Sequence, residues 1–203
     1  MKNLEVSELR SLIEKEVAAI KNIPLDDSIT DAVNLIHSKV HESNGKVVIA
    51  GMGKAGQIGM NIATTLSSTG TPAMFIHPGE SQHGDIGVLQ PNDVLMLISN
   101  SGITDEVLTL AELAKNLHAD LVVISLTGDR SGRLHELSDV SLITGRPEEI
   151  CPLGLTPTTS TTVMTVIGDL LVVSLMKKIG FTKEEYAKRH HSGYLGKKSR
   201  DNG

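Results

Sequence analysis

Short hydrophobic runs alternate with amphipathic segments along the middle of the chain. Five runs are predominantly apolar, which is typical of strands buried on both faces of a parallel sheet. They cover residues 47–50, 73–76, 94–99, 121–126 and 140–143. Segments with helical spacing lie between them at 55–68, 105–117 and 132–137. Strands that alternate with helices in this way predict an α/β fold.

Helical patterns also flank this central region. Residues 4–23 form one such pattern, which Pro24 ends, and residues 26–43 form a second. Residues 158–178 predict a long apolar helix and 183–190 a shorter one, before a polar tail at 197–203 that we expect to fray. We therefore expect one domain over 1–203, a three-layer sandwich with a five-stranded parallel sheet, N-terminal helices at 4–43 and a C-terminal helix and tail at 182–203.

The composition narrows the function. The chain has 203 residues, a formal net charge of −5, two Tyr, two Phe and no Trp. An acidic chain with few aromatic rings disfavours nucleic-acid and membrane-surface binding. The single cysteine, Cys151, has no internal disulfide partner, which indicates a reducing compartment. The most hydrophobic stretch, 163–176, is short for a bilayer span and carries Asp169, so we expect a cytoplasmic protein.

Candidate chemistry is expected just beyond the carboxyl ends of the strands, where parallel sheets bind ligands. After the first strand, Gly51, Gly53 and Gly56 form a G-x-G-x-x-G pattern around Lys54. The pattern alone is a weak dinucleotide signature, and the second strand ends without an acid for a ribose. We predict that Lys54 is a catalytic or substrate-anchoring cation. A simple glycine turn with a solvated lysine is the alternative.

Two hydroxyl-rich segments predict a phosphate site. Ser99, Asn100, Ser101 and Thr104 follow the third strand and reach a helix N-terminus, where N–H groups and the helix dipole attract anions. A plain helix cap would need only Thr104. The second cluster is a run of five hydroxyls at the start of the long helix: Thr158, Thr159, Ser160, Thr161 and Thr162. With no Walker loop and no Lys or Arg clamp, we expect one phosphomonoester held from two sides.

Acid–base candidates occupy three further segments, one after the second strand, one before Cys151 and one near the C-terminus. They are His77, Glu80, His83, Asp85, Arg146, Glu148, Glu149, His190 and His191. Any one of these taken singly is more often structural than catalytic. A metal shared by His77 and His83 could inhibit the protein, but the sequence has no HExxH or Cys/His ligand spacing, so we expect no metal cofactor.

Six motifs, in chain order, resemble the sugar isomerase (SIS) domain of D-arabinose 5-phosphate isomerases. They are GMGKAG from Gly51, HPGE from His77, HGD from His83, SNSG from Ser99, CPLGLTPTTSTT from Cys151 and HxxGxLG from His190. The likeness covers residues 25–197, and the last two motifs are the most specific. It implies the SIS fold, a flavodoxin-like or Rossmann-like sandwich.

The resemblance also implies an activity, the interconversion of D-ribulose 5-phosphate and D-arabinose 5-phosphate. That reaction leads to 3-deoxy-D-manno-octulosonate (Kdo) of lipopolysaccharide and some capsules. Lys54, Glu106, Glu149 and His190 are then the catalytic candidates. Gly53 and His83 join the two hydroxyl clusters as substrate-binding candidates.

The sequence departs from the family pattern in three places. Family members typically carry a C-terminal pair of CBS domains, and this chain stops soon after Leu195, so we expect that regulatory module to be missing. His191 stands where a proline is usual, and Ile103 where the serine loop is often polar. These differences concern regulation and fine specificity more than the reaction.

An aldose–ketose isomerisation needs ring opening, a base for the C2 proton and a stabilised enediolate. We expect His190 to open the ring and Lys54 to stabilise the oxyanion. Glu106 and Glu149 are the acid–base carboxylates, with burial raising the pKa of the base toward neutrality. Neither a metal nor a nicotinamide is needed.

The long helix has too many apolar positions for a single buried face, which favours a subunit contact. The resemblance implies a homotetramer whose active sites lie at subunit interfaces. His190 is a candidate for a residue that one subunit contributes to the active site of another. Downstream sugar-acid products could bind the same site. Three alternatives stay open: another SIS isomerase acting on a heptose or hexulose phosphate, a non-catalytic phosphosugar sensor, and an NAD-binding domain.

Overall fold

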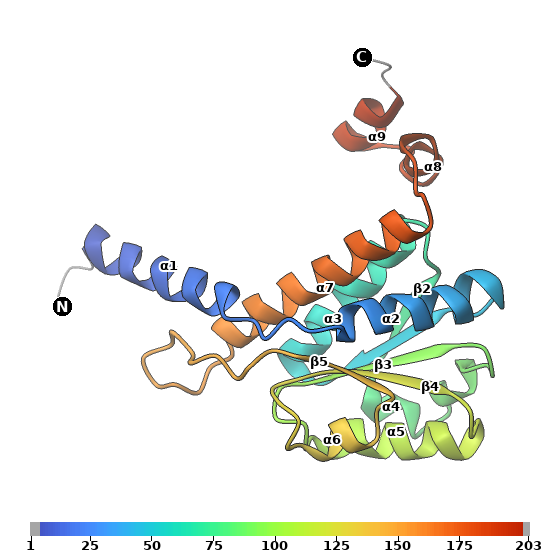
Figure 1. The fold of residues 1–203 in the computed structure, drawn as a ribbon, viewed down its shortest axis with the longest axis horizontal. Coiled ribbons are helices and arrows are strands. Elements are labelled where there is room, and N and C mark those ends of the chain that lie inside the picture. The colour runs from blue at the N-terminus through green and yellow to red at the C-terminus, as the bar shows by residue number, and fades with distance from the viewer. Residues whose placement is uncertain (1–4, 201–203) are drawn as a thin grey trace.

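A five-stranded, all-parallel sheet forms the centre of the computed structural model, which describes residues 5–200 (Figure 1). The strand order is β2-β1-β3-β4-β5. The strands are β1 (Val47–Gly51), β2 (Ala73–Ile76), β3 (Val94–Ser99), β4 (Val122–Thr127) and β5 (Val140–Ile143). The predicted α/β class and parallel sheet are confirmed, and strand ends differ from the predicted ones by one residue at most.

Helices cover both faces of the sheet. They are α1 (Val6–Lys21), α2 (Ser28–Ile36), α3 (Gly53–Ser68), α4 (Pro78–Ser81), α5 (Asp105–Leu117), α6 (Arg133–Glu136), α7 (Thr159–Lys178), α8 (Lys183–Arg189) and α9 (Gly193–Arg200), with a π-helix η1 (His37–Glu42) and a 3-10 helix η2 (Asp85–Val88). In Figure 1, α2, α3 and α7 lie on one face, and α4, α5 and α6 lie on the other. α1 and the α8–α9 pair project from opposite ends of α7.

Two hydrophobic clusters hold these layers together. Alternate residues of β1 point to opposite faces, so Val47 and Ile49 join the cluster under α2, α3 and α7, while Val48 and Ala50 join the one under α5. All four are fully buried. Burial on both faces explains why the central strands are almost continuously apolar rather than alternating.

The helix expected over 26–43 is divided in the structure. α2 ends at Ile36 and the chain continues as the π-helix η1. A π-turn inserts into a helix without disturbing its apolar face for long, so spacing alone does not reveal it.

The expected frayed tail is wrong for residues 197–200, which belong to α9. The Arg200 guanidinium donates hydrogen bonds to the backbone oxygens of His190 and His191, and Gly196 packs against the His190 carbonyl. These contacts hold the segment in place. Leu4 at the start of the expected first helix, and residues 201–203 of the tail, lie outside the described residues.

α7 extends beyond the apolar stretch 163–176 and has 20 residues. Within residues 5–200, it is the one helix whose length and composition would allow it to cross a membrane. Length therefore does not exclude a span, contrary to the expectation for 163–176. Half of its most apolar window is buried inside the domain, as in the core helix of an α/β protein.

Candidate active site

The carboxyl edge of the sheet contains a cavity that is lined by Lys54 and by residues of both hydroxyl clusters. β1 and β3 are neighbours, but α3 follows β1 on one face and α5 follows β3 on the other, which makes this the switch point of the sheet. A cavity of about 530 Å³ lies here. Its walls are Met52, Lys54, Ala55, Ile98, Ser99, Asn100, Ser101, Ile103, Thr104, Arg146, Pro157, Ser160, Thr161 and Met164.

The loop between β3 and α5 is organised by its own hydroxyls. Ser99 Oγ lies 2.7 Å from Thr104 Oγ1 and 3.4 Å from Ser101 Oγ, and it accepts a hydrogen bond from the Gly102 N–H. Thr104 is the N-cap residue of α5, yet its side chain makes no capping bond. The hydroxyl of Thr104 therefore serves the loop, and the first N–H groups of α5 are left for another acceptor. A plain helix cap does not account for this arrangement.

Gly102 has a backbone conformation that a side chain would disturb. Its φ is +68°, and a Cβ atom would lie 3.0 Å from Thr127 Oγ1 and 3.1 Å from Gly132 Cα. Glycine thus permits both the left-handed turn and the close approach of the α6 segment.

Lys54 is the second residue of α3 and is exposed to the cavity. Across residues 5–200 its ammonium has no ion-pair partner. Gly53 in front of it has φ +56° with open space around its Cα, whereas a Cβ on Gly56 would lie 2.4 Å from the Gly51 oxygen. The glycine pattern therefore has a packing reason, and it delivers Lys54 to the cavity at a helix N-terminus.

Glu149 is tied to the start of α7. One oxygen of its carboxylate, Oε2, accepts hydrogen bonds from the Thr158 N–H at 2.7 Å, the Thr158 hydroxyl at 2.9 Å and the Ser160 N–H at 3.3 Å. Burial by itself would raise the pKa of Glu149, but the hydrogen bonds from Ser160 and Thr158 outweigh it and hold that pKa below the ordinary value. The expectation that burial raises the pKa of Glu149 toward neutrality is wrong.

The hydroxyls at the start of α7 point in different directions. Ser160 and Thr161 line the cavity. Thr158 is bonded to Glu149, and the buried Thr159 donates its hydroxyl to Glu16 Oε1 at 2.8 Å while accepting from the Ile150 N–H. Thr158 thus holds the segment before α7, and Thr159 holds α1, against the start of α7. Neither of the two lines the cavity.

Besides Thr158, Thr159 and His190, four more predicted site residues lie outside the cavity wall: Gly53, His83, Glu106 and Glu149. Glu149 lines a second cavity of about 320 Å³, between α1 and residues 144–150. Glu106 is half-buried in the first turn of α5, two residues beyond Thr104. His83 is exposed between α4 and η2.

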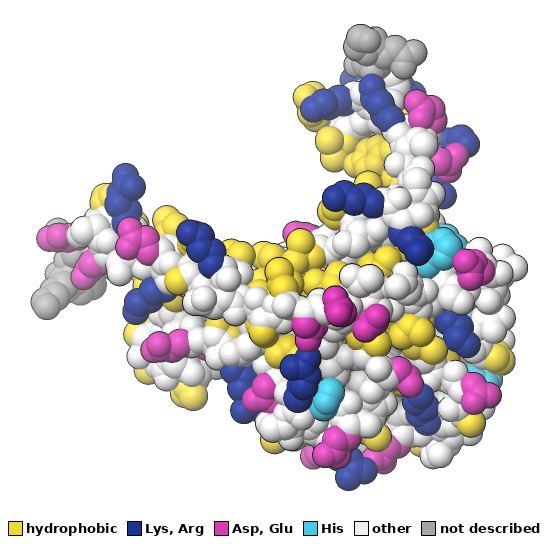
Figure 2. Space-filling model, viewed as in Figure 1, with side chains coloured by type: hydrophobic (Ala, Val, Ile, Leu, Met, Phe, Trp, Pro, Cys, Tyr) yellow, Lys and Arg dark blue, Asp and Glu magenta, His cyan; other side chains and the backbone are white. Residues whose placement is uncertain are grey.

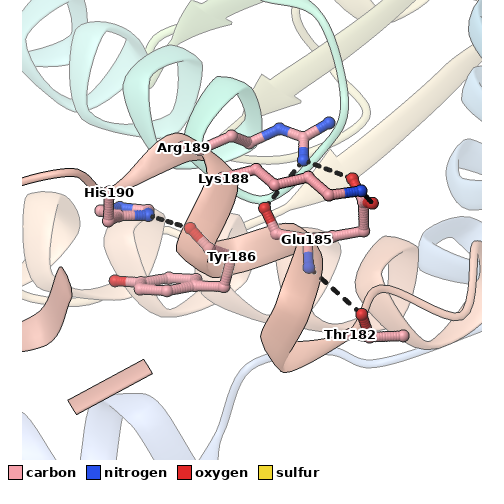
Figure 3. A network of polar contacts seen from close by, with 6 residues as sticks. All are labelled: Thr182, Glu185, Tyr186, Lys188, Arg189 and His190. Carbon is pink, nitrogen blue, oxygen red and sulfur yellow. Dashed lines mark hydrogen bonds and ion pairs between the residues drawn. The ribbon is translucent and has the colours of Figure 1, made fainter. Parts of the chain in front are cut away.

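His190 is remote from the cavity of its own chain. The cavity lies at the N-terminus of α7, and His190 follows α8, beyond the other end of a helix about 30 Å long. Figure 3 shows the surroundings of His190. Its Nδ1 lies 3.0 Å from the backbone oxygen of Tyr186, and the imidazole stacks on the Tyr186 ring with the ring centroids 3.7 Å apart. Close by, the Arg189 guanidinium donates a hydrogen bond to the Glu185 carboxylate. The chain by itself does not bring His190 together with Lys54.

Arg146 is the wall residue that sequence reasoning did not place there. It follows β5 closely, and its Nε lies 2.8 Å from Asp129 Oδ2. The sequence predicted a phosphate site without a Lys or Arg clamp, whereas the cavity wall carries Arg146 as well as Lys54. Its position just past the end of a strand could have predicted a place at the cavity. Because Glu148 and Glu149 lie beside it in the sequence, it was grouped with the acid–base candidates instead.

The histidines show no metal geometry. Within residues 5–200, no group of three or more His, Cys, Asp or Glu side chains is arranged to hold a metal ion. His77 is the N-cap of α4, and its Nδ1 accepts a hydrogen bond from the Gly79 N–H at 3.2 Å. That bond gives His77 a structural role.

The fold and the cavity define a sugar isomerase domain. The family model for the SIS domain matches residues 39–174, and this chain belongs to that family. Among curated proteins, the arabinose 5-phosphate isomerase KdsD of Escherichia coli K12 is 46% identical over 187 residues, which is 91% of this chain and 56% of that protein. The chain spans about half the length of the curated relatives it matches.

Two solved structures are similar over nearly their whole length. One is a candidate phosphosugar isomerase involved in capsule formation from Bacteroides fragilis, with 57% identity and a TM-score of 0.91, covering 93% of this chain and 98% of that one. The other is an Escherichia coli CFT073 protein in complex with arabinose 5-phosphate, with 34% identity and a TM-score of 0.82, covering 94% and 100% of the two chains.

Proposed function

We propose that this chain is an aldose–ketose isomerase that interconverts D-ribulose 5-phosphate and D-arabinose 5-phosphate. The observation that carries the proposal is the single cavity lined by both hydroxyl clusters, with Lys54 on its wall. The choice of substrate is supported by the similarity to KdsD and to the E. coli CFT073 protein with bound arabinose 5-phosphate. The product would feed Kdo synthesis, as the resemblance implies.

The phosphate is assigned to the hydroxyls of Ser99, Ser101, Ser160 and Thr161. Ser99 and Ser101 come from the β3–α5 loop, and the other two come from the start of α7. Both segments lead into helix N-termini, where the helix dipole favours an anion. The first N–H groups of α5 are free to bind it, whereas at α7 the Ser160 N–H already donates to Glu149 and the hydroxyls are the available donors. A phosphomonoester gripped from two sides leaves its sugar carbons near Lys54.

Proton transfer is assigned to the carboxylates Glu149 and Glu106. Glu149, whose pKa lies below the ordinary value, is ionised at neutral pH, as a base that accepts the proton from C2 of the aldose and returns it to C1 must be. Lys54 stabilises the oxyanion of the enediolate. The hydrogen bonds from Thr158 and Ser160 set the position of Glu149 beside the cavity wall.

Ring opening is assigned to His190 of another copy of the chain in a homotetramer. Hydrophobic side chains gather along α7 between the two projecting ends (Figure 2). Both α1 and α7 carry exposed apolar residues: Leu9, Ile13 and Val17 on α1, and Leu170 and Val173 on α7. Mixing Lys54→Ala with His190→Ala subunits should restore activity in hybrids, and hybrids as inactive as either parent would contradict sharing.

The substrate is tested by assaying the purified protein against pentulose, hexulose and heptose phosphates. We expect ribulose 5-phosphate to give the highest kcat/KM. Faster turnover of a hexulose or heptose phosphate would establish a different SIS isomerase. Binding without turnover of any sugar phosphate would indicate a sensor.

A further inference from the structure

We infer that Arg146 binds the phosphate group of the substrate, as a second cation of the cavity besides Lys54. The inference rests on the proposed function for the identity of the substrate. It assigns a specificity-determining residue to a position outside the two hydroxyl clusters, on the segment that follows β5.

The backbone of Arg146 is held in an unfavourable conformation. Its φ is +50°, in the left-handed region that non-glycine residues rarely adopt. It also precedes Pro147, where an extended backbone is preferred. Residues kept in sparsely populated conformations are destabilising and cluster at ligand sites. A merely solvated arginine would not need this strain.

The chain before Arg146 fixes where the strained residue lies. The Thr144 N–H donates to the backbone oxygen of Thr127, and the Gly145 N–H donates to the backbone oxygen of Gly128, each at 2.9 Å. The pairing of β5 with β4 is thereby extended past the ends of both strands. Arg146 is the first residue free of this ladder, and its side chain is delivered to the carboxyl edge of the sheet.

The stem of Arg146 lies over Gly128, next to the serine loop. A Cβ on Gly128 would lie 2.8 Å from Arg146 Cγ, 3.0 Å from its Nε and 2.4 Å from the Asn100 oxygen. Glycine at 128 thus leaves the room that the arginine stem occupies. The same contacts place that stem beside Asn100, which belongs to the hydroxyl-rich loop that we assign to the phosphate.

The guanidinium of Arg146 is oriented by one ion pair, which leaves other N–H donors available for a ligand. Asp129 Oδ2 pairs with Nε at 2.8 Å, and Ser131 in turn donates to Asp129 through its N–H and hydroxyl. Throughout residues 5–200, Nη1 and Nη2 make no hydrogen bond. Two parallel N–H donors on a planar fork match two phosphate oxygens, which an ammonium matches less well.

The test compares Arg146→Asn, Arg146→Lys and Arg133→Gln. Asparagine tolerates a positive φ, so Arg146→Asn removes the cation without adding backbone strain. Arg133 is the matched control, because it is also a half-exposed arginine paired with one carboxylate, that of Glu112, and it lies outside the cavity. The readouts are kcat and KM for ribulose 5-phosphate, and the Kd for inorganic phosphate from ³¹P NMR titration.

We expect Arg146→Asn to raise KM and the phosphate Kd together by about tenfold or more, as for the loss of a hydrogen bond to a charged group, with kcat within about threefold of wild type. Arg146→Lys should recover part of the loss, and Arg133→Gln should change neither value. An unchanged phosphate Kd in Arg146→Asn would overturn the inference. A fall in kcat with unchanged KM would also overturn it, because it would place Arg146 at the reacting carbons.

The phosphate titration separates this inference from the proposed function. If the wild-type protein binds phosphate but isomerises no pentose phosphate, the proposed function fails. The Kd comparison then still decides the role of Arg146.

Discussion

The two ends of the sheet differ in how completely their polar side chains are bonded. At the amino end, Asp93 is 1% exposed and both its oxygens are engaged: Oδ1 accepts from the Lys46 N–H, and Oδ2 accepts from Lys46 Nζ at 2.6 Å and from the Gln90 N–H at 2.8 Å. At the carboxyl end, the buried hydroxyl of Thr127 has no partner and the Lys54 ammonium has no ion pair within residues 5–200.

We expect this difference to separate residues that stabilise the domain from residues that bind the substrate. When a buried carboxylate has all its oxygens satisfied, removing a partner exposes the desolvation cost of the buried groups and lowers the stability of the domain. Donors left free around a cavity contribute nothing until a ligand arrives. Substitutions at the carboxyl end should therefore change catalysis more than stability, and those at the amino end should do the reverse.

Glu149→Gln should have the largest effect. Because the amide cannot accept the substrate proton, we expect kcat to fall by about 100-fold or more, the usual contribution of an acid–base group. Glutamine keeps a carbonyl oxygen for the Thr158 and Ser160 N–H groups but loses the charge that these bonds stabilise, so we expect a modest fall in the melting temperature beside the large loss of kcat. A variant that retains more than about a tenth of the wild-type kcat would exclude Glu149 as the base. Glu106→Gln, measured in parallel, assigns the role between the two.

Lys54→Met should follow in size. It keeps the length of the side chain but removes the charge that stabilises the enediolate oxyanion, so we expect about a 100-fold loss of kcat. The free energy of unfolding should stay within about 0.5 kcal/mol of wild type, because Lys54 is exposed and has no ion-pair partner in the described chain. A large loss of stability with full activity would reverse the comparison between the two ends.

Asp93→Asn tests the amino end. It breaks a charged hydrogen-bond cluster and should lower the free energy of unfolding by about 2 kcal/mol, or the melting temperature by about 4–8 °C. The kcat of the folded variant should equal that of wild type. Asp120→Asn, an exposed aspartate, is the control and should be neutral. If Asp93→Asn lowers kcat at unchanged stability, the division of labour between the two ends fails.

Cys151 offers the smallest effect and a check on the loop between Glu149 and α7. The Thr156 N–H donates to Sγ at 3.2 Å, and backbone hydrogen bonds from this loop lower the thiol pKa from 9.0 to about 7. The rate of alkylation by iodoacetamide should therefore reach half its maximum near pH 7. The urea-unfolded protein, which lacks these bonds, is the control and should titrate near the ordinary value. A folded protein that titrates there too would show that the loop is not formed as described.

The sheet could be predicted because burial on both faces makes β1 and β3 almost wholly apolar, a pattern that needs no knowledge of distant contacts. The serine loop and Lys54 were also found, since ligand sites of parallel sheets follow strand ends.

The parts that could not be predicted depend on contacts between distant segments. The pKa of Glu149 is lowered by Thr158 and Ser160, and hydroxyls so near in sequence suggested phosphate binding rather than this bond. Arg146 reaches the cavity because Gly128, on another strand, leaves room for its stem. His190 is separated from its own cavity because it follows α8, beyond the C-terminal end of α7, while the cavity lies at the N-terminus of α7.

The most direct measurement is proton NMR of D-ribulose 5-phosphate incubated with the protein in D₂O. The account predicts that D-arabinose 5-phosphate forms and carries deuterium at C2, because a carboxylate that exchanges with solvent returns the hydrogen to the enediolate. Failure to form arabinose 5-phosphate, or deuterium at C3 in place of C2, would contradict it.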